Sequence, residues 1–232
     1  MTAIPLPEPC QGCQLITVCR FTEEAPGAFC RTLTRNELLY RQGEAALQLY
    51  VPLSGSLRLC RLDANDQPRL VDFAFPGEVI GLEAIGESYY QAQVLALEAS
   101  RICILPTLRL ERWLVANPTA AFRLARLLSA QLARMHQQGS LTGRRAPDTR
   151  LAAFLVILAR RLGRGRTPAR LHLSMARWEI ARVLGLRTET VSRYFHELER
   201  RGLIRICCRE LELTDWEGLE ALAALPRLEA MV

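Results

Sequence analysis

The sequence predicts an α+β protein made of an antiparallel β-barrel or jelly roll, one long helix and a C-terminal winged helix-turn-helix. Three observations predict this fold. Short apolar runs with period-two alternation, separated by turn residues, fill residues 33–105. An apolar stripe at helical spacing follows Asn117, and two short helices joined by a tight turn lie near the C-terminus.

Composition limits the class of protein. Half of the 232 residues are apolar, so the chain can bury a substantial core. It contains no uncharged apolar run of about 18 residues, and its first residues lack a basic segment followed by an apolar one. We therefore expect a cytoplasmic protein that does not use a membrane.

Charge is strongly segregated along the chain. Residues 112–209 hold 20 arginines against 5 acidic residues, whereas the segments on either side are net acidic. A basic block of this size usually faces a polyanion, and nucleic acid is the commonest one inside cells.

The long helix is expected to begin at Asn117-Pro118, with Asn as the N-cap and Pro at the first helical position. Apolar or small residues follow at spacings of 3 and 4, which favours a two-stranded coiled-coil seam in a homodimer, although a core helix gives a similar stripe. The predicted seam consists of Ala125, Leu128, Leu132, Met135 and Gly139.

A helix-turn-helix is predicted in "LSMARWEIARVLGLRTETVSRYFHELERRGLIRI". Gly185 permits the sharp turn, and "LIRICCRELELT" can form a two-stranded wing. The apolar faces of the two helices are expected to consist of Trp178, Ile180, Ala181 and Leu184 and of Val191, Tyr194, Phe195 and Leu198.

The second helix carries three polar residues on one face near its start. Glu189, Ser192 and Arg193 stand at i, i+3 and i+4. In a major groove, Arg can donate twice to guanine, Glu can accept from cytosine N4, and Ser is a small adaptable contact. We expect these residues to read bases in double-stranded DNA. The expected phosphate contacts are Arg182, Arg187, Arg200 and Arg201.

Three cysteines form a C-x2-C-x5-C cluster in "CQGCQLITVC": Cys10, Cys13 and Cys19. In a reducing cytosol, such spacing more often marks a metal or redox site than a disulfide framework. C-x2-C fits zinc well, and thiols that switch to a disulfide are a further alternative. A dithiol oxidoreductase would need a βαβ context, which a Pro-rich segment leading into a β-barrel does not supply, so we do not expect an enzyme.

Three stretches, "LYRQGEAALQLYVPLSGSLRL", "FPGEVIGLEAIG" and "LGLRTETVSRYFHELERRGLI", resemble the Crp/Fnr superfamily of bacterial transcription regulators. The resemblance implies a cyclic-nucleotide-binding-type barrel, a dimerisation helix and a winged helix-turn-helix. The expected parts are a cysteine-rich leader (1–30), a sensory barrel (31–109), a dimerisation helix with hinge (110–145) and a DNA-binding domain (146–232).

Within the superfamily the chain resembles the oxygen-sensing Fnr branch, whose reader helix carries E-x-x-S-R. That resemblance implies a [4Fe–4S] cluster held by Cys10, Cys13, Cys19 and Cys103, the last in "RICILP". It also implies a homodimer on a two-fold symmetric TTGAT-like site, RNA polymerase as a partner, and release of DNA when oxygen destroys the cluster. Zinc or thiol redox sensing in a Crp/Fnr-type regulator is the alternative.

Two rival ligands fit the sequence poorly. A cyclic nucleotide needs a cation in the barrel, but residues 70–100 contain no Arg or Lys, so no cyclic nucleotide is expected. An internal haem ligand is missing because all three histidines lie outside the predicted barrel. The remaining cysteines are interpreted as structural or incidental, although Cys30 could compete as a ligand: Cys30, Cys60, Cys207 and Cys208.

Two departures from the Fnr pattern affect the predicted switch. The segment between Cys19 and "YRQGE" is shorter than in Fnr-type proteins. Fnr-type dimer helices also carry an acidic residue that helps to keep the cluster-free form monomeric, whereas residues 112–147 contain none. The sequence therefore leaves the monomer–dimer step open.

Overall fold

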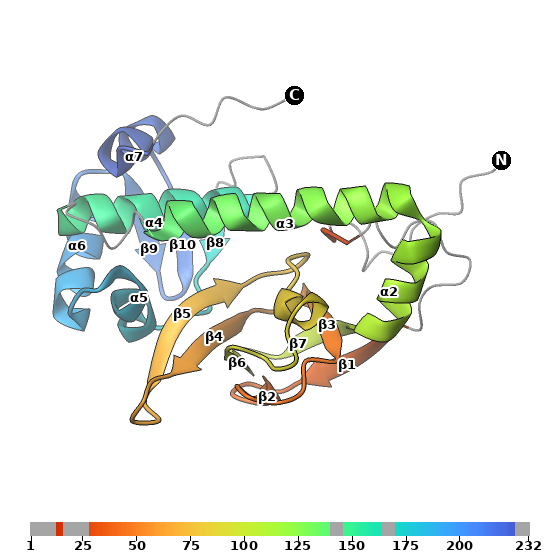
Figure 1. The fold of residues 1–232 in the computed structure, drawn as a ribbon. Coiled ribbons are helices and arrows are strands. Elements are labelled where there is room, and N and C mark those ends of the chain that lie inside the picture. The colour runs from red at the N-terminus through yellow and green to blue at the C-terminus, as the bar shows by residue number, and fades with distance from the viewer. Residues whose placement is uncertain (1–12, 16–27, 140–145, 164–169, 226–232) are drawn as a thin grey trace. The chain divides into compact units, whose positions relative to one another are not determined.

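The computed structural model describes residues 13–15, 28–139, 146–163 and 170–225 (Figure 1). The chain divides into two compact units, Met1–Ala133 and Arg134–Val232. In the described part of the chain, no helix is both long enough and apolar enough to cross a membrane.

The first unit contains two antiparallel sheets. One has the order β1-β7-β3, formed by Phe29–Leu33, Ser100–Pro106 and Gln48–Ser54. The other has the order β2-β6-β4-β5, formed by Leu38–Tyr40, Gln93–Ala96, Leu57–Leu62 and Pro68–Ala74. A short 3-10 helix, η2, covers Leu82–Ile85. The expected antiparallel β architecture is confirmed.

The turn between β3 and β4 depends on Gly55. Its φ of 76° lies in the left-handed region. A Cβ at this position would stand 2.6 Å from the carbonyl oxygen of Ala99, which is too close. The turn in "SGS" therefore requires glycine at position 55 for steric reasons.

Three tyrosines stack in the core of the first unit. The ring centroid of Tyr40 lies 5.1 Å from that of Tyr50 and 4.0 Å from that of Tyr90. The Tyr90 hydroxyl donates to the carbonyl oxygen of Gln48 at 2.7 Å. Burial raises the pKa of Tyr40 and of Tyr50 above that of an exposed phenol. The phenols are therefore neutral parts of the packing.

Helices α2 (Thr107–Ala116) and α3 (Pro118–Gly139) follow β7 directly. Leu110 and Leu124 are buried in the same core as the strands. Asn117 separates the helices: its carbonyl oxygen accepts from the amides of Ala120 and Ala121, and its side chain donates to the carbonyl oxygen of Trp113. The predicted helix start at Pro118 is confirmed. Helix α2 was not predicted from the sequence.

The second unit is built around α4 (Pro147–Gly163), whose residues from Leu151 to Val156 are all buried. α4 packs against α6 and α7. The other elements are β8 (Arg170–His172), α5 (Arg177–Leu184), α6 (Thr188–Arg200), β9 (Ile204–Cys207), β10 (Glu210–Leu213) and α7 (Trp216–Ala223). The predicted wing is the β9–β10 hairpin, and β8 adds a third strand that was not expected.

Candidate functional site

The turn between α5 and α6 is set by Gly185. Its φ is 62°, and its amide reaches the carbonyl oxygens of Ala181 and Arg182 at the end of α5. The amide of Leu186 also bonds to the carbonyl oxygen of Ala181 at 2.9 Å. Arg187 is the N-cap residue of α6, in extended conformation and without a side-chain cap bond, so the helix begins at Thr188.

An apolar interface fixes α6 against α5. Ile180, Leu184, Val191 and Phe195 are at most 2% exposed. The Arg177 guanidinium lies 3.4 Å from the centroid of the Phe195 ring, and its burial lowers the pKa of Arg177. The opposite face of α6 takes no part in this packing.

The placement of Trp178 in this apolar face is wrong. Trp178 is 43% exposed, and the Arg182 guanidinium lies 5.4 Å from its ring centroid. Residues four apart share a helical face, which places Trp178 beside the exposed Arg182 and to one side of the buried face formed by Ile180 and Leu184. Tyr194 is only half-buried, whereas the other predicted residues of both faces are buried.

The three predicted base-reading residues lie away from the core. Glu189 and Arg193 are exposed, and Ser192 is half-buried. The Arg193 guanidinium lies 5.1 Å from the ring centroid of Tyr194 on the same helix. Thus α6 presents a carboxylate, a hydroxyl and a guanidinium within its first two turns.

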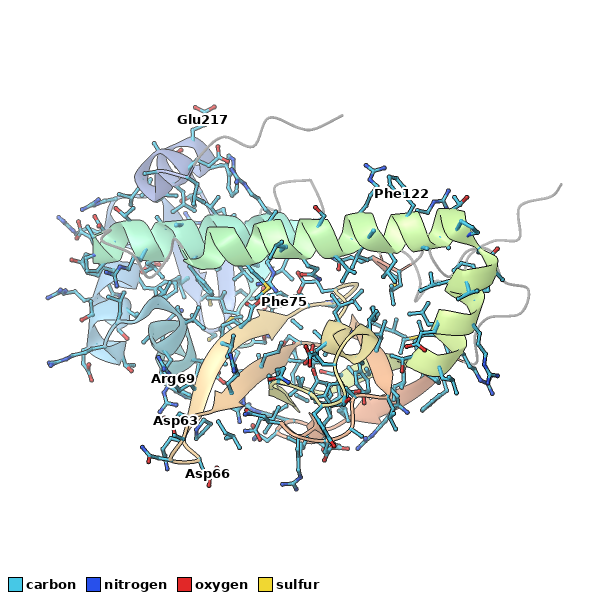
Figure 2. The ribbon with its side chains drawn as sticks, in the orientation of Figure 1. Asp63, Asp66, Arg69, Phe75, Phe122 and Glu217 are labelled. Carbon is cyan, nitrogen blue, oxygen red and sulfur yellow. The ribbon has the colours of Figure 1, made fainter. Side chains whose placement is uncertain are left out.

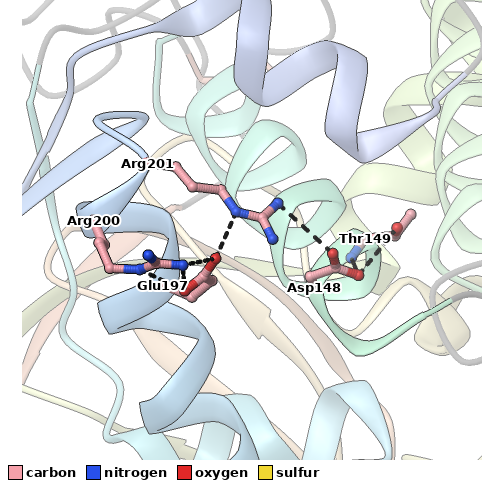
Figure 3. A network of polar contacts seen from close by, with 5 residues as sticks. All are labelled: Asp148, Thr149, Glu197, Arg200 and Arg201. Atoms are coloured by element: carbon pink, nitrogen blue, oxygen red, sulfur yellow. Dashed lines mark hydrogen bonds and ion pairs between the residues drawn. The ribbon is translucent and has the colours of Figure 1, made fainter.

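The four predicted phosphate-contacting arginines are all exposed: Arg182, Arg187, Arg200 and Arg201. Two of them share one carboxylate, because Glu197 accepts from Arg200 and from Arg201 at 2.8 Å each (Figure 3). Arg201 also lies 4.0 Å from Asp148 of α4. The hydrogen bonds from Arg200 and Arg201 lower the pKa of Glu197. Acidic partners therefore offset part of the charge of this arginine pair.

Two of the four predicted cluster ligands are described by the structure. Cys13 and Cys103 are half-buried, and both pack against the same apolar core. Cys10 and Cys19 lie outside the described residues. Among the residues that the structure does describe, no three His, Cys, Asp or Glu side chains are grouped as a metal site. The thiols of Cys13 and Cys103 are of the donor type that an iron–sulfur cluster takes.

Cys13 begins a short described segment, residues 13–15, that is hydrogen-bonded to other parts of the first unit. The amide of Gln14 donates to the carbonyl oxygen of Gly77 at 2.8 Å, and the Gln14 side-chain oxygen accepts from the amide of Val79 at 3.3 Å. The Gln131 side chain donates to that same oxygen at 3.3 Å and to the carbonyl oxygen of Val79 at 3.4 Å. Leu15 is 2% exposed. The residue after Cys13 is therefore bonded to α3.

Gln14 and Gln131 were not predicted as site residues from the sequence. Their side chains meet across 117 positions of sequence, and neither belongs to a periodic pattern. Only the position of Gln14 beside a predicted ligand distinguished it from other glutamines.

Helix α3 has an exposed apolar face. Phe122, Leu132 and Met135 are 67%, 55% and 65% exposed, and Ala125 is also exposed. Figure 2 shows Phe122 on the side of α3 away from the strands. Leu128 differs from the other predicted seam residues because it is half-buried and packs against the core. Gly139 ends the helix, and Phe122 was not included in the predicted seam.

Two family models match the sequence. The cyclic nucleotide-binding domain matches residues 30–117, and the Crp-like helix-turn-helix domain matches residues 149–222. A β-domain of this type followed by a helix-turn-helix defines a DNA-binding transcription regulator, and not an enzyme.

Individual relatives place the chain more narrowly. It is 35% identical over 189 residues to the transcriptional regulatory protein btr of Bordetella pertussis, covering 81% of this chain and 78% of that protein. It is 32% identical to the transcriptional activator protein anr of Pseudomonas aeruginosa, over 83% of this chain and 80% of that protein. The chain belongs to the Crp/Fnr family of transcription regulators.

A solved structure agrees with this assignment. The structure of FixK2 from Bradyrhizobium japonicum matches with a TM-score of 0.78 and 26% identity, covering 85% of this chain and 98% of that one. The predicted family and fold class are thereby confirmed.

Proposed function

We propose that the protein is an oxygen-responsive transcription regulator that binds DNA as a homodimer while four cysteines hold a [4Fe–4S] cluster. The observation that carries the proposal is the bonding of Gln14, the neighbour of Cys13, to Gln131 of α3. Relatives lend support: the fumarate and nitrate reduction regulatory protein of Escherichia coli is 26% identical over 85% of this chain and 79% of that protein.

In this proposal, Cys10, Cys13 and Cys19 of the leader and Cys103 of β7 are the ligands. The bound cluster supplies an oxygen-labile cross-link between leader and barrel. While the Cys13 thiolate is held, Gln14 keeps its bonds to Gly77, Val79 and Gln131. Release of Cys13 removes one restraint on this turn, so the contact of Gln14 with α3 weakens.

The exposed apolar face of α3 is the proposed homodimer interface. Large apolar side chains at helical spacing on a surface mark an interaction site. Phe122, Ala125, Leu132 and Met135 supply this face, and Leu128 and Gly139 complete the predicted seam. A symmetric dimer places two copies of α6 on the two halves of a TTGAT-like site.

On DNA, Glu189, Ser192 and Arg193 read base edges in the major groove. Arg182, Arg187, Arg200 and Arg201 contact phosphates, and RNA polymerase is the proposed protein partner. The β-sheet domain is proposed to act without binding a cyclic nucleotide, because residues 70–100 contain no Arg or Lys that could pair with a cyclic phosphate.

The proposal is tested by anaerobic purification followed by an absorption spectrum and iron and sulfide assays. We expect a coloured protein with four irons per chain that binds a TTGAT-containing duplex and loses that affinity in air. Cys103→Ser should lose the cluster, whereas Cys60→Ser, which changes a buried cysteine of β4, should keep it. A colourless protein with stoichiometric zinc would instead favour the zinc alternative.

A further inference from the structure

Two cysteines face each other across the β1–β7 ladder. In the antiparallel register, Cys30 is the direct partner of Cys103. Directly opposed residues of antiparallel strands have side chains on the same face and Cα atoms about 4.5–5.5 Å apart. Disulfides join Cα atoms about 4.4–6.8 Å apart, so the backbone spacing is compatible with a bond.

The surroundings of Cys30 and Cys103 favour formation of a disulfide between them. Cys30 is exposed and Cys103 is half-buried, whereas the neighbours Ile102 and Ile104 on β7 are buried. β1 is the edge strand of its sheet, with β7 as its neighbour. Opposed Cβ atoms in a ladder lie about 4.5–5.5 Å apart, against about 3.8 Å in a disulfide. Closure needs a small inward shift, which an edge strand can make.

We propose that Cys30 and Cys103 form a reversible disulfide when a hydroperoxide meets the protein without a ligand on Cys103. The exposed Cys30 thiol reacts first: hydrogen peroxide transfers one oxygen, giving a sulfenic acid and one water. The Cys103 thiol then attacks that sulfur, forming the S–S bond and releasing a second water. The two sulfurs lose two electrons in total, which reduce the peroxide.

The disulfide has a regulatory consequence that rests on the proposed function. Cys103 is a proposed cluster ligand, and a sulfur bonded to Cys30 cannot bind iron as a thiolate. Peroxide would therefore lock the protein in the cluster-free state until a thiol reductant restores Cys103. In this scheme Cys30 is the peroxide-reactive thiol, Cys103 is the thiol that resolves its sulfenic acid, and Cys30 is not a cluster ligand.

Peptide mapping tests the bond directly. The full-length cluster-free chain is treated with hydrogen peroxide, alkylated and digested with trypsin without reduction. Cleavage after arginine places Cys30 alone in "FTEEAPGAFCR", Cys103 alone in "ICILPTLR", and Cys10, Cys13 and Cys19 together in the N-terminal leader peptide "MTAIPLPEPCQGCQLITVCR". We expect the first two peptides to be linked and the link to disappear with dithiothreitol. Linkage of the Cys103 peptide to the leader peptide, or an unlinked oxidised Cys103, would overturn the proposal.

A register variant provides the matched control. In Cys30→Ser/Thr32→Cys, the exposed thiol moves two positions along β1 and faces Arg101 instead of Cys103. We expect this variant and Cys30→Ser to lose the link. Equal linkage in the register variant would show that proximity alone, and not the cross-strand pair, determines the bond. A Cys207→Ser/Cys208→Ser background removes two exposed thiols that could link separate molecules.

A second measurement separates this proposal from the cluster proposal. Peroxide-oxidised wild-type protein should fail to rebuild a cluster from iron and sulfide until its disulfide is reduced. Peroxide-treated Cys30→Ser should rebuild more cluster per chain than the oxidised wild-type protein does. A mapped disulfide in a protein that never assembles a cluster would refute the cluster and keep the disulfide. A protein that assembles its cluster but never forms the Cys30–Cys103 disulfide would refute the disulfide and keep the cluster.

Discussion

The Gln131 side chain donates a hydrogen bond to the side-chain oxygen of Gln14 at 3.3 Å, joining α3 to the residue that follows Cys13. Gln131 also donates to the carbonyl oxygen of Val79, which lies two residues beyond Gly77, the acceptor of the Gln14 amide. One α3 side chain thus contacts both the cysteine-bearing turn and the segment on which that turn rests.

Gln131→Ala should weaken anaerobic DNA binding without reducing the iron content. The change removes the hydrogen bonds to Gln14 and to Val79, each worth about 0.5–1.5 kcal/mol, and loss of the bond to Gln14 alone corresponds to roughly 2- to 13-fold in affinity. Titration of a TTGAT duplex under anaerobic conditions measures the loss. Ser129→Ala, a change at an exposed position of the same helix, is the control. Equal losses in the two variants would remove the special role of Gln131.

Arg193→Ala should cost about 1–3 kcal/mol on the specific site and little on random DNA, because a bidentate contact to guanine discriminates between bases. The exposed Arg193 stands on the outer face of α6. Competition titrations with both duplexes give the specificity ratio. A uniform loss would mean that Arg193 contacts only phosphate.

Arg187→Ala should weaken binding to both duplexes alike and reduce the slope of log affinity against log salt by about 1. Arg187 is exposed at the start of α6. Binding isotherms at several salt concentrations measure the slope. Preserved affinity for random DNA, combined with lost specificity, would assign Arg187 to base reading.

Glu197→Gln should strengthen binding to random DNA and steepen its salt dependence. The change removes the carboxylate that pairs with Arg200 and Arg201 and leaves more of their positive charge for phosphates. Because these arginines lower the pKa of Glu197, its carboxylate is ionised at neutral pH and holds them in the wild type. Unchanged binding would place both arginines away from the duplex.

Leu132→Glu should shift the protein from dimer to monomer, because burying a leucine contributes about 1.5–3 kcal/mol and a buried unpaired carboxylate costs more. Analytical ultracentrifugation of the cluster-bound protein measures the shift. Leu108→Glu makes the same change at an exposed leucine of α2 outside the predicted seam. A dimer that survives the first change, or dissociates equally with both, would contradict the proposed interface.

Local signals predicted much of the fold. The left-handed turn at Gly185, the helix start at Pro118 and the wing in "LIRICCRELELT" each depend on neighbouring residues, so short stretches of sequence sufficed. Trp178 was misplaced because bulk and hydrophobicity suggested burial, whereas its angular position on α5 leaves it exposed. The short helices α2 and α7 were not predicted.

The candidate sites were predictable only in part. The C-x2-C-x5-C spacing and the E-x-x-S-R pattern are local, and they identified candidate residues. The bond between Gln14 and Gln131 and the opposition of Cys30 and Cys103 depend on tertiary register across 117 and 73 positions. No local propensity carries that information.

Asn117 holds the junction of α2 and α3 with four hydrogen bonds. Its amide donates to the carbonyl oxygen of Leu114, its side chain donates to that of Trp113, and its carbonyl oxygen accepts from Ala120 and Ala121. Since α2 packs against β7, we infer that this elbow couples the direction of α3 to the orientation of β7. A small tilt of the strand that carries Cys103 would swing the far end of α3 through a larger arc, so the elbow can amplify a local disturbance.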